Sequence, residues 1–560
     1  MQALRAEECL RRGAFSEAVE RASEALRQSS PAARARLFAL RSAALRGAGH
    51  ADAARRDGAR AAAGSGAEAP PAPGDCTQAQ PDALFAAADA AAAASTLPGA
   101  SPAVCCADAG AQGRGLFVTG RVPCGAALLC ELPFACVVHK AARSSRCHQC
   151  LHRLPPDALP CCSCSVARYC SKACCDRAAQ GPHGRLECGG AAWPAALPTE
   201  AVLSARVAWT LSRGGDPAAA VSLLIAHWAG VPASERAERC ALAAVLSACT
   251  RLAPAELLAA ALTLRSNCFA VTDEWATECW SGGEREQLRA GAALYCTASM
   301  VNHSCAPNAH VSFAQGGALV LRASRDLGPA REQLLIAYGP QQGQQPCTRR
   351  RKMLRASHGF QCACEACVSP DAARRDVELC GLRCLADESC DGATHMPAEA
   401  HDDFVAPCTR CGVAAPMGVV RAAVSRAHAA RAALEGARER RDVSSLRSVL
   451  AELRAVAHAH NRRTSEAWDA LAQALNERGG SQGAAAEAYE ACSHSLRILR
   501  VHYPPRSLPL AHELAKVALL ASACGEAEAA RAAAAEATAV FVANYGESYP
   551  RLRELQSLLE

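Results

Sequence analysis

The chain has 560 residues, of which 50% are hydrophobic, 20% are charged and only 4% are aromatic. At roughly 150 residues per domain this length predicts about three to four domains, and the apolar content excludes a chain that is disordered throughout. The net charge of +6 is small for this length. It gives no indication of a nucleic-acid-binding protein, which would concentrate basic residues on one stripe.

The 33 cysteines fit either a secreted disulfide protein or an intracellular zinc protein. The first residues, MQALRAEECLRRGAF, are amphipathic and do not have the apolar core of a secretory signal. No strongly apolar run of about 18 residues follows, so we expect no membrane span. Because many of the cysteines form closely spaced pairs, we favour zinc binding in a reducing compartment.

Residues 1–63 predict helical hairpins. The pattern LRRGAFSEAVERASEAL (10–26) returns about 34 residues later as LRGAGHADAARRDGARA (45–61), a period typical of tetratricopeptide (TPR) repeats. An ordinary helical pair is the alternative, because Ala-rich segments resemble one another by accident. Residues 64–104 predict a linker rich in Pro and Gly.

Residues 105–140 have the pattern of short strands and turns. A cysteine cluster follows at 147–188, and the apolar periodicity of 195–265 predicts helices. Strand-like sequence resumes at 266–340, where 310–324 predicts a hairpin around Gly316 and Gly317. Residues 418–560 predict a second array of helical hairpins, in which Tyr503 and Tyr545 recur 42 residues apart.

The first cysteine cluster offers four ligand pairs, enough for two tetrahedral zinc sites. The pairs are Cys147 with Cys150, Cys161 with Cys164, Cys170 with Cys174, and His183 with Cys188. Unpaired buried cysteines are the alternative, and eight candidate ligands in this order make it improbable. Spacing alone leaves open which pairs share an ion.

Two further clusters follow. Cys362, Cys364 and Cys367 provide three thiolates and need a fourth ligand, for which Cys305 is the candidate. Residues 380–411 hold five more cysteines, and here zinc and free thiols are equal alternatives. Those five are Cys380, Cys384, Cys390, Cys408 and Cys411.

An ordered set of motifs resembles the SMYD lysine methyltransferases, in which a MYND zinc module interrupts a split SET domain. The set is Gly113-Arg114-Gly115-Leu116, the eight-ligand cluster, Asn302-His303-Ser304-Cys305, Tyr338 in LLIAYGP, and Phe360 before the CxCxxC cysteines. The helical repeats on both sides resemble the TPR-bearing branch of this family.

The resemblance implies an α+β multidomain protein. It would have a split β-rich SET domain (105–140 and 266–340), an inserted MYND module (147–188), a helical SET insert (195–265) and a post-SET zinc region (341–367). Residues 380–411 are the candidate for an additional zinc knuckle. TPR-like α-helical repeats flank it at 1–63 and 418–560.

The resemblance also implies residue roles. The cofactor would be S-adenosylmethionine, and Tyr338 would stand at the methyl-transfer centre. Cofactor contacts would come from Gln112, Gly113, Arg114, Asn267, Ser299, Asn302, His303, Tyr338 and Phe360. One MYND zinc would use Cys147, Cys150, Cys170 and Cys174, the other Cys161, Cys164, His183 and Cys188. The post-SET zinc would use Cys305, Cys362, Cys364 and Cys367.

Two positions depart from the family pattern. The last MYND pair is usually H-x3-C, and here His183 and Cys188 are separated by four residues, which predicts a bulged helix or a shifted ligand. A tyrosine expected two positions before Phe360 is His358, which changes the polarity where a substrate lysine would enter.

The predicted function is an S-adenosylmethionine-dependent protein-lysine N-methyltransferase with three zinc ions, and a fourth left open. The alternative is a MYND and TPR scaffold with a weak or inactive SET domain that recruits partners such as deacetylase corepressors. A zinc-based DNA binder is weaker, because no basic recognition helix follows the clusters.

The expected partners are a protein that presents a lysine, a Pro-containing peptide or corepressor on the MYND module, and a chaperone or other protein on the TPR-like helices. We expect no direct nucleic-acid binding and no membrane association, and a cytoplasmic and nuclear location.

Overall fold

A computed structural model of the chain describes residues 2–28, 31–47, 54–55, 57–58, 61–62, 97–161, 164, 166–188, 197–214, 221, 224, 231–273, 288–328, 331–395, 407–478 and 482–560. Most of the predicted linker at 64–104 and part of the helical insert at 195–265 lie outside these residues. None of the helices that the structure describes is long and apolar enough to cross a membrane.

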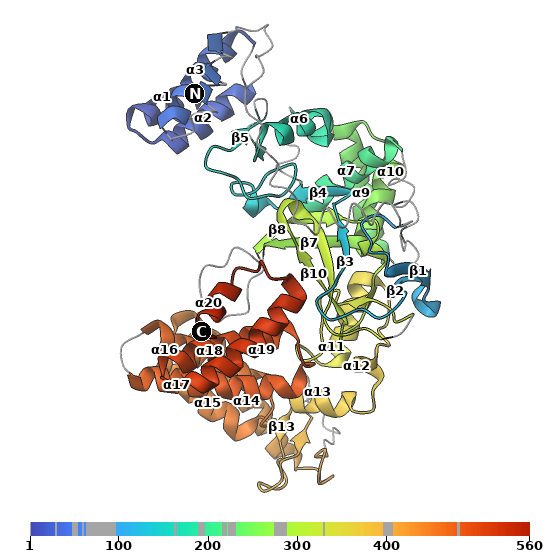
Figure 1. The fold of residues 1–560 in the computed structure, drawn as a ribbon, viewed down its shortest axis with the longest axis vertical. Coiled ribbons are helices and arrows are strands. Elements are labelled where there is room, and N and C mark those ends of the chain that lie inside the picture. Colours follow the sequence, from blue (N-terminus) through green and yellow to red (C-terminus); the bar gives the residue numbers. More distant parts are fainter. Residues whose placement is uncertain are drawn as a thin grey trace.

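The N-terminal unit consists of three helices, which Figure 1 shows at one end of the molecule. They are α1 (Gln2–Arg11), α2 (Phe15–Gln28) and α3 (Pro31–Gly47). Each helix packs against the next one through small residues such as Ala18 and Ala44, because Ala lets two helices approach closely. The described residues at this end are therefore helical, while much of the second predicted repeat at 45–61 lies outside the described residues and the assignment to TPR repeats stays a prediction.

Short antiparallel strands form the central part of the molecule (Figure 1). One sheet has the order β10-β11-β3, a second has the order β4-β8-β7, and β1 pairs with β2. The strand bounds are β1 (Val104–Asp108), β2 (Arg114–Val118), β3 (Ala127–Glu131), β4 (Ala135–Val138), β7 (Cys268–Asp273), β8 (Leu288–Leu294), β10 (Ala309–Phe313) and β11 (Leu319–Ala323).

The hairpin predicted at 310–324 is present. Ala309 pairs with Ala323 and Phe313 with Leu319, and the turn contains Gly316 and Gly317 at φ of 79° and 68°. Side chains other than Gly adopt this left-handed region at a cost, so the two glycines permit the tight turn. The buried Tyr295 hydroxyl donates to the carbonyl of Gly317 and fixes the turn against the core.

Both halves of the split domain share one core. β3, from before the cysteine cluster, pairs with β11 from after it, and β4 likewise pairs with β8. Leu116, Leu129, Ala293 and Leu321 are buried together. The residues between β4 and β7 are thus an insertion into a single folded unit.

The insertion begins with the zinc module and continues into helices. The module contains β5 (Leu159–Pro160), β6 (Arg168–Tyr169), α6 (Lys172–Gln180) and the π-helical turn η4 (His183–Glu187). The helices are α7 (Thr199–Ser212), α9 (Ala233–Thr250) and α10 (Pro254–Asn267). α7 packs against β4 and α10, which attaches the insertion to the strands.

After the strands come three helices and a two-stranded hairpin. They are α11 (Cys347–His358), α12 (Glu365–Val368), α13 (Ala372–Cys380), β13 (Leu382–Arg383) and β14 (Ala393–Thr394).

The C-terminal part is an array of antiparallel helices with an Ala- and Leu-rich core. Its members are α14 (Met417–Arg440), α15 (Val443–Val456), α16 (Arg462–Arg478), α17 (Gln482–His502), α18 (Leu508–Ala523), α19 (Ala527–Tyr545) and α20 (Leu552–Gln556). The recurring tyrosines fall at equivalent places: Tyr503 follows α17 and Tyr545 ends α19.

The helical array is joined directly to the strands. α19 packs against β10 and β11, and Ser324 Oγ donates to Asn544 Oδ1 at 2.9 Å. The Tyr503 ring lies against Gly343, where an added Cβ would come within 2.9 Å of it. This close packing forms one wall of the cavity described below.

Candidate active site and metal centres

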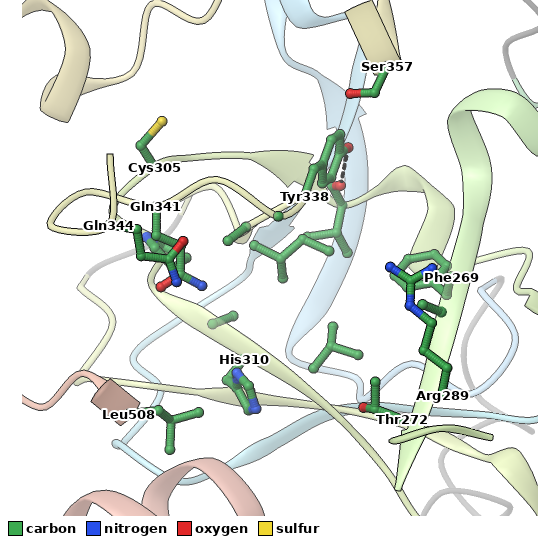
Figure 2. Close-up of a pocket in the computed structure, with 18 of the residues that line it drawn as sticks. Phe269, Thr272, Arg289, Cys305, His310, Tyr338, Gln341, Gln344, Ser357 and Leu508 are labelled. Carbon is green, nitrogen blue, oxygen red and sulfur yellow. Dashed lines mark hydrogen bonds between the residues drawn. The ribbon is translucent and has the colours of Figure 1, made fainter. Parts of the chain in front are cut away.

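A cavity of about 2270 Å³ lies between the central strands, α9, α10 and the C-terminal helices. Figure 2 shows Ser357 and Tyr338 at one end of it and His310 and Leu508 at the other. A space of this size, open to solvent and walled by two parts of the chain, can hold an extended segment of another protein as well as a small molecule.

Tyr338 is held in this cavity by its backbone and by its side chain. It follows β12 (Leu335–Ile336), which pairs in parallel with β9 (Asn302–His303). The Tyr338 N–H donates to His303 Nδ1 at 3.0 Å, and its hydroxyl donates to the Val301 carbonyl at 2.7 Å. Burial raises the pKa of Tyr338 to about 12. The hydroxyl therefore stays protonated and its oxygen keeps lone pairs for a further partner.

Three rings surround the Tyr338 ring. The centroids of His358, His303 and Phe360 lie 4.8, 5.3 and 6.4 Å from its centroid. His358, the departure from the family pattern, thus stands beside the predicted catalytic tyrosine, and burial lowers its pKa. Of these three rings, His358 lines the cavity together with Tyr338.

His303 connects Tyr338 with the predicted post-SET ligand Cys305. Because Nδ1 accepts the Tyr338 N–H, the neutral ring carries its hydrogen on Nε2, and Nε2 lies 3.3 Å from Cys305 Sγ. Burial lowers the pKa of His303 to about 4, which keeps the ring neutral at physiological pH. Cys305 and Tyr338 therefore contact the same side chain, that of His303.

The predicted glycine turn lies beside this assembly and is not part of the cavity lining. Gln112 ends the short helix η2 (Gly110–Gln112), and Gly113 has a φ of 75°. The Arg114 carbonyl accepts from Asn302 Nδ2 at 2.9 Å. An added Cβ at Gly115 would lie 2.6 Å from Gln333 Nε2 and 3.0 Å from Asn302 Nδ2. A larger residue there would have to displace the amide ends of Gln333 and Asn302.

The other two predicted cofactor residues, Asn267 and Ser299, line the cavity. Asn267 ends α10, and Ser299 lies in the turn η5 (Ala298–Met300). Ser299 Oγ donates to the Tyr295 carbonyl at 2.5 Å and lies 3.4 Å from the Asn267 carbonyl. The structure thus brings the predicted site residues into one region around the loop 299–303 and Tyr338.

Sequence reasoning missed Glu131, which supports this loop. Its carboxylate accepts the backbone N–H groups of Thr297 and Ala298, each at 2.9 Å. Burial raises its pKa to about 7, although these N–H groups act in the opposite direction. An acidic residue at the end of the apolar strand ALLCE was the only indication available in the sequence.

Four groups of four ligand atoms each converge in the part of the chain that the structure describes. The predicted sets appear as Cys147, Cys150, Cys170, Cys174; then Cys161, Cys164, His183, Cys188; then Cys305, Cys362, Cys364, Cys367. A tetrahedral zinc with Zn–S bonds of about 2.3 Å requires sulfur atoms about 3.8 Å apart. Sulfur pairs lie 3.6 to 3.7 Å apart in the first set, 3.6 Å in the second and 3.6 to 4.0 Å in the third. The donor sets therefore fit Zn²⁺.

The longer spacing between His183 and Cys188 takes the form of a π-helical turn. The Cys188 N–H donates to the His183 carbonyl, five residues back, at 2.7 Å. A π-turn accommodates one extra residue in a helix. Gly184 makes this possible, because an added Cβ would lie 1.9 Å from the Ala179 carbonyl oxygen. The bulge that the sequence predicted keeps His183 among the ligands.

A buried ionic network orients His183. Its Nδ1 lies 3.2 Å from Glu187 Oε2, while its Nε2 faces Cys161 and Cys164. Glu187 is fully buried. Burial alone would raise its pKa, but the Arg206 guanidinium, bound to both oxygens, and the two histidines hold that pKa well below its usual range. This carboxylate fixes the ring of the metal ligand, as is common in zinc sites.

The fourth group lies in the segment 380–411, where zinc and free thiols were equal alternatives. It contains Cys384, Cys390, Cys408 and Cys411. Cys380 ends α13 and is not a member, so the partner pair of Cys408 and Cys411 is Cys384 with Cys390.

Comparison with known proteins agrees with this arrangement. A SET domain family model matches residues 113–339, which include both halves of the split domain and the inserted module. The chain is 27% identical over 242 residues to protein-lysine N-methyltransferase SMYD4 of Pongo abelii and 28% identical over 248 residues to SMYD4 of Homo sapiens. Each match covers 42% of this chain and 28% of the relative.

A further relative is histone-lysine N-methyltransferase SMYD3 of Homo sapiens, 28% identical over 275 residues, which are 46% of this chain and 60% of that protein. The chain spans less than a third of the length of the SMYD4 relatives. The fold and the match define a protein with a SET domain split by a zinc module. Within that class the chain is similar to the SMYD proteins, with SMYD4 and SMYD3 among the relatives it matches.

Proposed function

We propose that the protein is an S-adenosylmethionine-dependent protein-lysine N-methyltransferase. The observation that carries this proposal is Tyr338, whose protonated hydroxyl stands among three rings in a cavity large enough for a protein segment. The similarity to proteins named lysine methyltransferases supports the same activity.

The residues present fit the cofactor. Gly115 is buried against the side chains of Gln333 and Asn302, and Asn302 Nδ2 donates to the Arg114 carbonyl, so the glycine turn is held against the loop 299–303. Ser266 Oγ, next to Asn267 in the cavity lining, and Gln333 Nε2 are buried without a hydrogen-bond partner, as expected where a polar ligand completes the site. The residues that would hold it are Gln112, Gly113, Arg114, Asn267, Ser299, Asn302, His303, Tyr338 and Phe360.

When bound, S-adenosylmethionine supplies the electrophilic methyl group. The residues of this chain would bind the lysine of the substrate protein and hold its amine in the neutral form. A charged ammonium loses solvation in a pocket of aromatic rings, and this lowers its pKa. The Tyr338 oxygen can accept a hydrogen bond from the amine while the hydroxyl donates its own hydrogen to the Val301 carbonyl. His358 lines the cavity beside Tyr338, and positioning of the reactants accounts for much of the rate in such reactions.

The zinc ions would be structural, because four protein ligands leave no open coordination position. The ligands of the MYND pair and of the post-SET site would be the three sets that contain Cys147, Cys161 and Cys305.

The proposal is tested with cofactor that carries a tritiated methyl group and a mixture of cellular proteins as methyl acceptors. We expect the wild-type protein to transfer the tritiated methyl group to lysine residues of the acceptor proteins. Tyr338→Phe should reduce labelling on the order of 100-fold, because misplaced reactants cost about that much, with cofactor binding retained. Tyr489→Phe, on the distant α17, is the matched control and should label normally. Equal labelling by Tyr338→Phe and wild type would refute the role of Tyr338.

A recruiting function is the second candidate, and the zinc module favours it. The module has a core of its own, which includes Leu159, Tyr169 and Ala178, and none of these residues lines the cavity. We propose that a Pro-containing peptide or corepressor binds there and that other proteins bind the helical repeats, in the cytoplasm and the nucleus. A pull-down that depends on the module's zinc, with no methyl transfer by folded protein, would favour recruitment alone.

A further inference from the structure

The hairpin β13–β14 and the turn after it bring four cysteines together outside the MYND and post-SET sites. Cys384 Sγ lies 3.8 Å from Cys411 Sγ, and Cys390 Sγ lies 3.7 Å from Cys408 Sγ. All four ligand atoms lie within 4.8 Å of one another. These separations match the edge of a zinc-thiolate tetrahedron, about 3.8 Å.

The same separations exclude two disulfides in this geometry, because bonded sulfur atoms lie about 2.05 Å apart. The backbone is also arranged to stabilise thiolates. The Gly392 N–H points to Cys390 Sγ at 3.4 Å, and the Arg410 N–H points to Cys408 Sγ at 3.5 Å. Hydrogen bonds to the charged form favour it, and the thiolate is the form that binds metal.

Two glycines shape the site around the sulfur atoms. An added Cβ at Gly392 would lie 2.3 Å from Cys408 Sγ. A side chain at this position would therefore displace the sulfur atom from the cluster. Gly412 follows the Cys408–Cys411 turn at a φ of 71° and donates its N–H to the Cys408 carbonyl at 3.0 Å. The turn is thereby closed with both sulfur atoms on the same side as Cys384 and Cys390.

The cluster lies where the post-SET region meets the C-terminal helices. The Gly381 carbonyl accepts from the His458 N–H at 3.1 Å and from Asn461 Nδ2 at 2.8 Å. His458 Nε2 lies 3.1 Å from the Asp391 carbonyl. Leu382 of β13 is buried against Ala427 of α14. The hairpin therefore docks onto α14 and onto the turn between α15 and α16.

We propose a fourth structural zinc site that fastens this hairpin to the C-terminal helices, with the ligands Cys384, Cys390, Cys408 and Cys411. Its four protein ligands leave no position for catalysis. Apart from the ion, the hairpin has two very short strands and buries Leu382 against the C-terminal helices, and a two-stranded hairpin by itself is marginal in water.

The first test is the zinc content of the full chain by elemental analysis. The double variant Cys408→Ser, Cys411→Ser should contain one zinc ion fewer than wild type. Cys380→Ser, a matched control from the same segment, should contain the wild-type number. An unchanged zinc content in the double variant would overturn the proposal.

The second test uses wild-type protein, and so does not depend on whether the variant folds. Cys411 is exposed, as are Cys240 and Cys249. In zinc-loaded protein a maleimide should modify Cys411 at least about 10-fold more slowly than Cys240 and Cys249, because a bound metal holds the thiolate. A chelator should abolish this protection. Modification of Cys411 at the rate of Cys240, or continued resistance after chelation, would overturn the proposal. Neither test involves cofactor or methyl transfer, so its outcome is independent of the proposed function.

Discussion

In the zinc module of residues 147–188, the candidate ligands surround a small core of their own. In the post-SET region, by contrast, Cys305 also touches His303, which holds the backbone of Tyr338. The ligand chemistry is nearly the same in both regions. What differs is the connection to the cavity. One side chain, His303, links Cys305 to Tyr338, whereas the ligands of the zinc module pack in a separate core.

This contrast predicts how the loss of each metal site would affect the geometry at Tyr338. Damage to the zinc module should unfold that module and leave the geometry at Tyr338 in place. Damage to the post-SET site should displace His303 and with it Tyr338. Four substitutions test the contrast, and they follow from the largest expected effect to the smallest.

Cys305→Ser should reduce methyl transfer to the background level. The substitution removes a metal ligand and the partner of His303 together, and metal binding contributes directly to folding. Cys174→Ser in the zinc module is the matched substitution. It should also lose one zinc ion, yet it should retain cofactor binding. Zinc content, methyl transfer and calorimetric cofactor binding are measured on both. Equal loss of cofactor binding would remove the contrast.

Arg206→Met should lower the free energy of unfolding by about 3 kcal/mol, because Glu187 would be left as a buried charge without its cation. Urea unfolding gives this value, and Arg185→Met, an exposed site on η4, should change it little. At a temperature where the variant is folded, cofactor binding should match wild type. A stability equal to that of wild type would contradict the assigned network.

Gly184→Ala should lower the free energy of unfolding by about 2 kcal/mol, within the range for overpacking. The new methyl group would collide with the Ala179 carbonyl and distort the π-turn. Gly418→Ala is the control, because an added Cβ meets nothing within 4 Å there. If both variants are equally stable, the turn is not constrained as described.

Glu131→Gln should change how stability depends on pH in the catalytic region. Its pKa in the folded protein, about 7, is higher than the ordinary value of 4.5. The protonated form therefore favours folding, and this contribution is lost as the pH rises through 7. Wild type should lose about 1 kcal/mol more than Glu131→Gln between pH 6 and pH 8. Urea unfolding at both pH values measures it, and identical pH profiles would contradict the raised pKa.

Much of the architecture could be predicted from sequence because it depends on local patterns. The hairpin at 310–324 was predicted by Gly316 and Gly317 between strand-like runs, and the structure confirms it. The helices at 418–560 followed from Ala-rich periodicity and recurring tyrosines. The spacing of His183 and Cys188 predicted a bulge, and a π-turn is present.

What could not be predicted depends on residues that are distant in sequence. Spacing left the partners of Cys408 and Cys411 open, because two short strands decide that Cys384 and Cys390 face them while Cys380 does not. Glu131 supports a loop more than 160 residues away, and no local pattern reveals that contact. The link from Cys305 through His303 to Tyr338 likewise needs the parallel pairing of β9 with β12.

The central claim is that the loop 299–303 and Tyr338 form a cofactor site, and calorimetric titration tests it most directly. S-adenosylmethionine is titrated into zinc-replete wild type, into Asn302→Ala, and into Gln473→Ala as a control on α16 outside the cavity lining. We predict saturable binding by wild type and by Gln473→Ala, and none by Asn302→Ala, which loses the contact to the Arg114 carbonyl. Failure of folded, zinc-replete wild type to bind the cofactor would contradict the account.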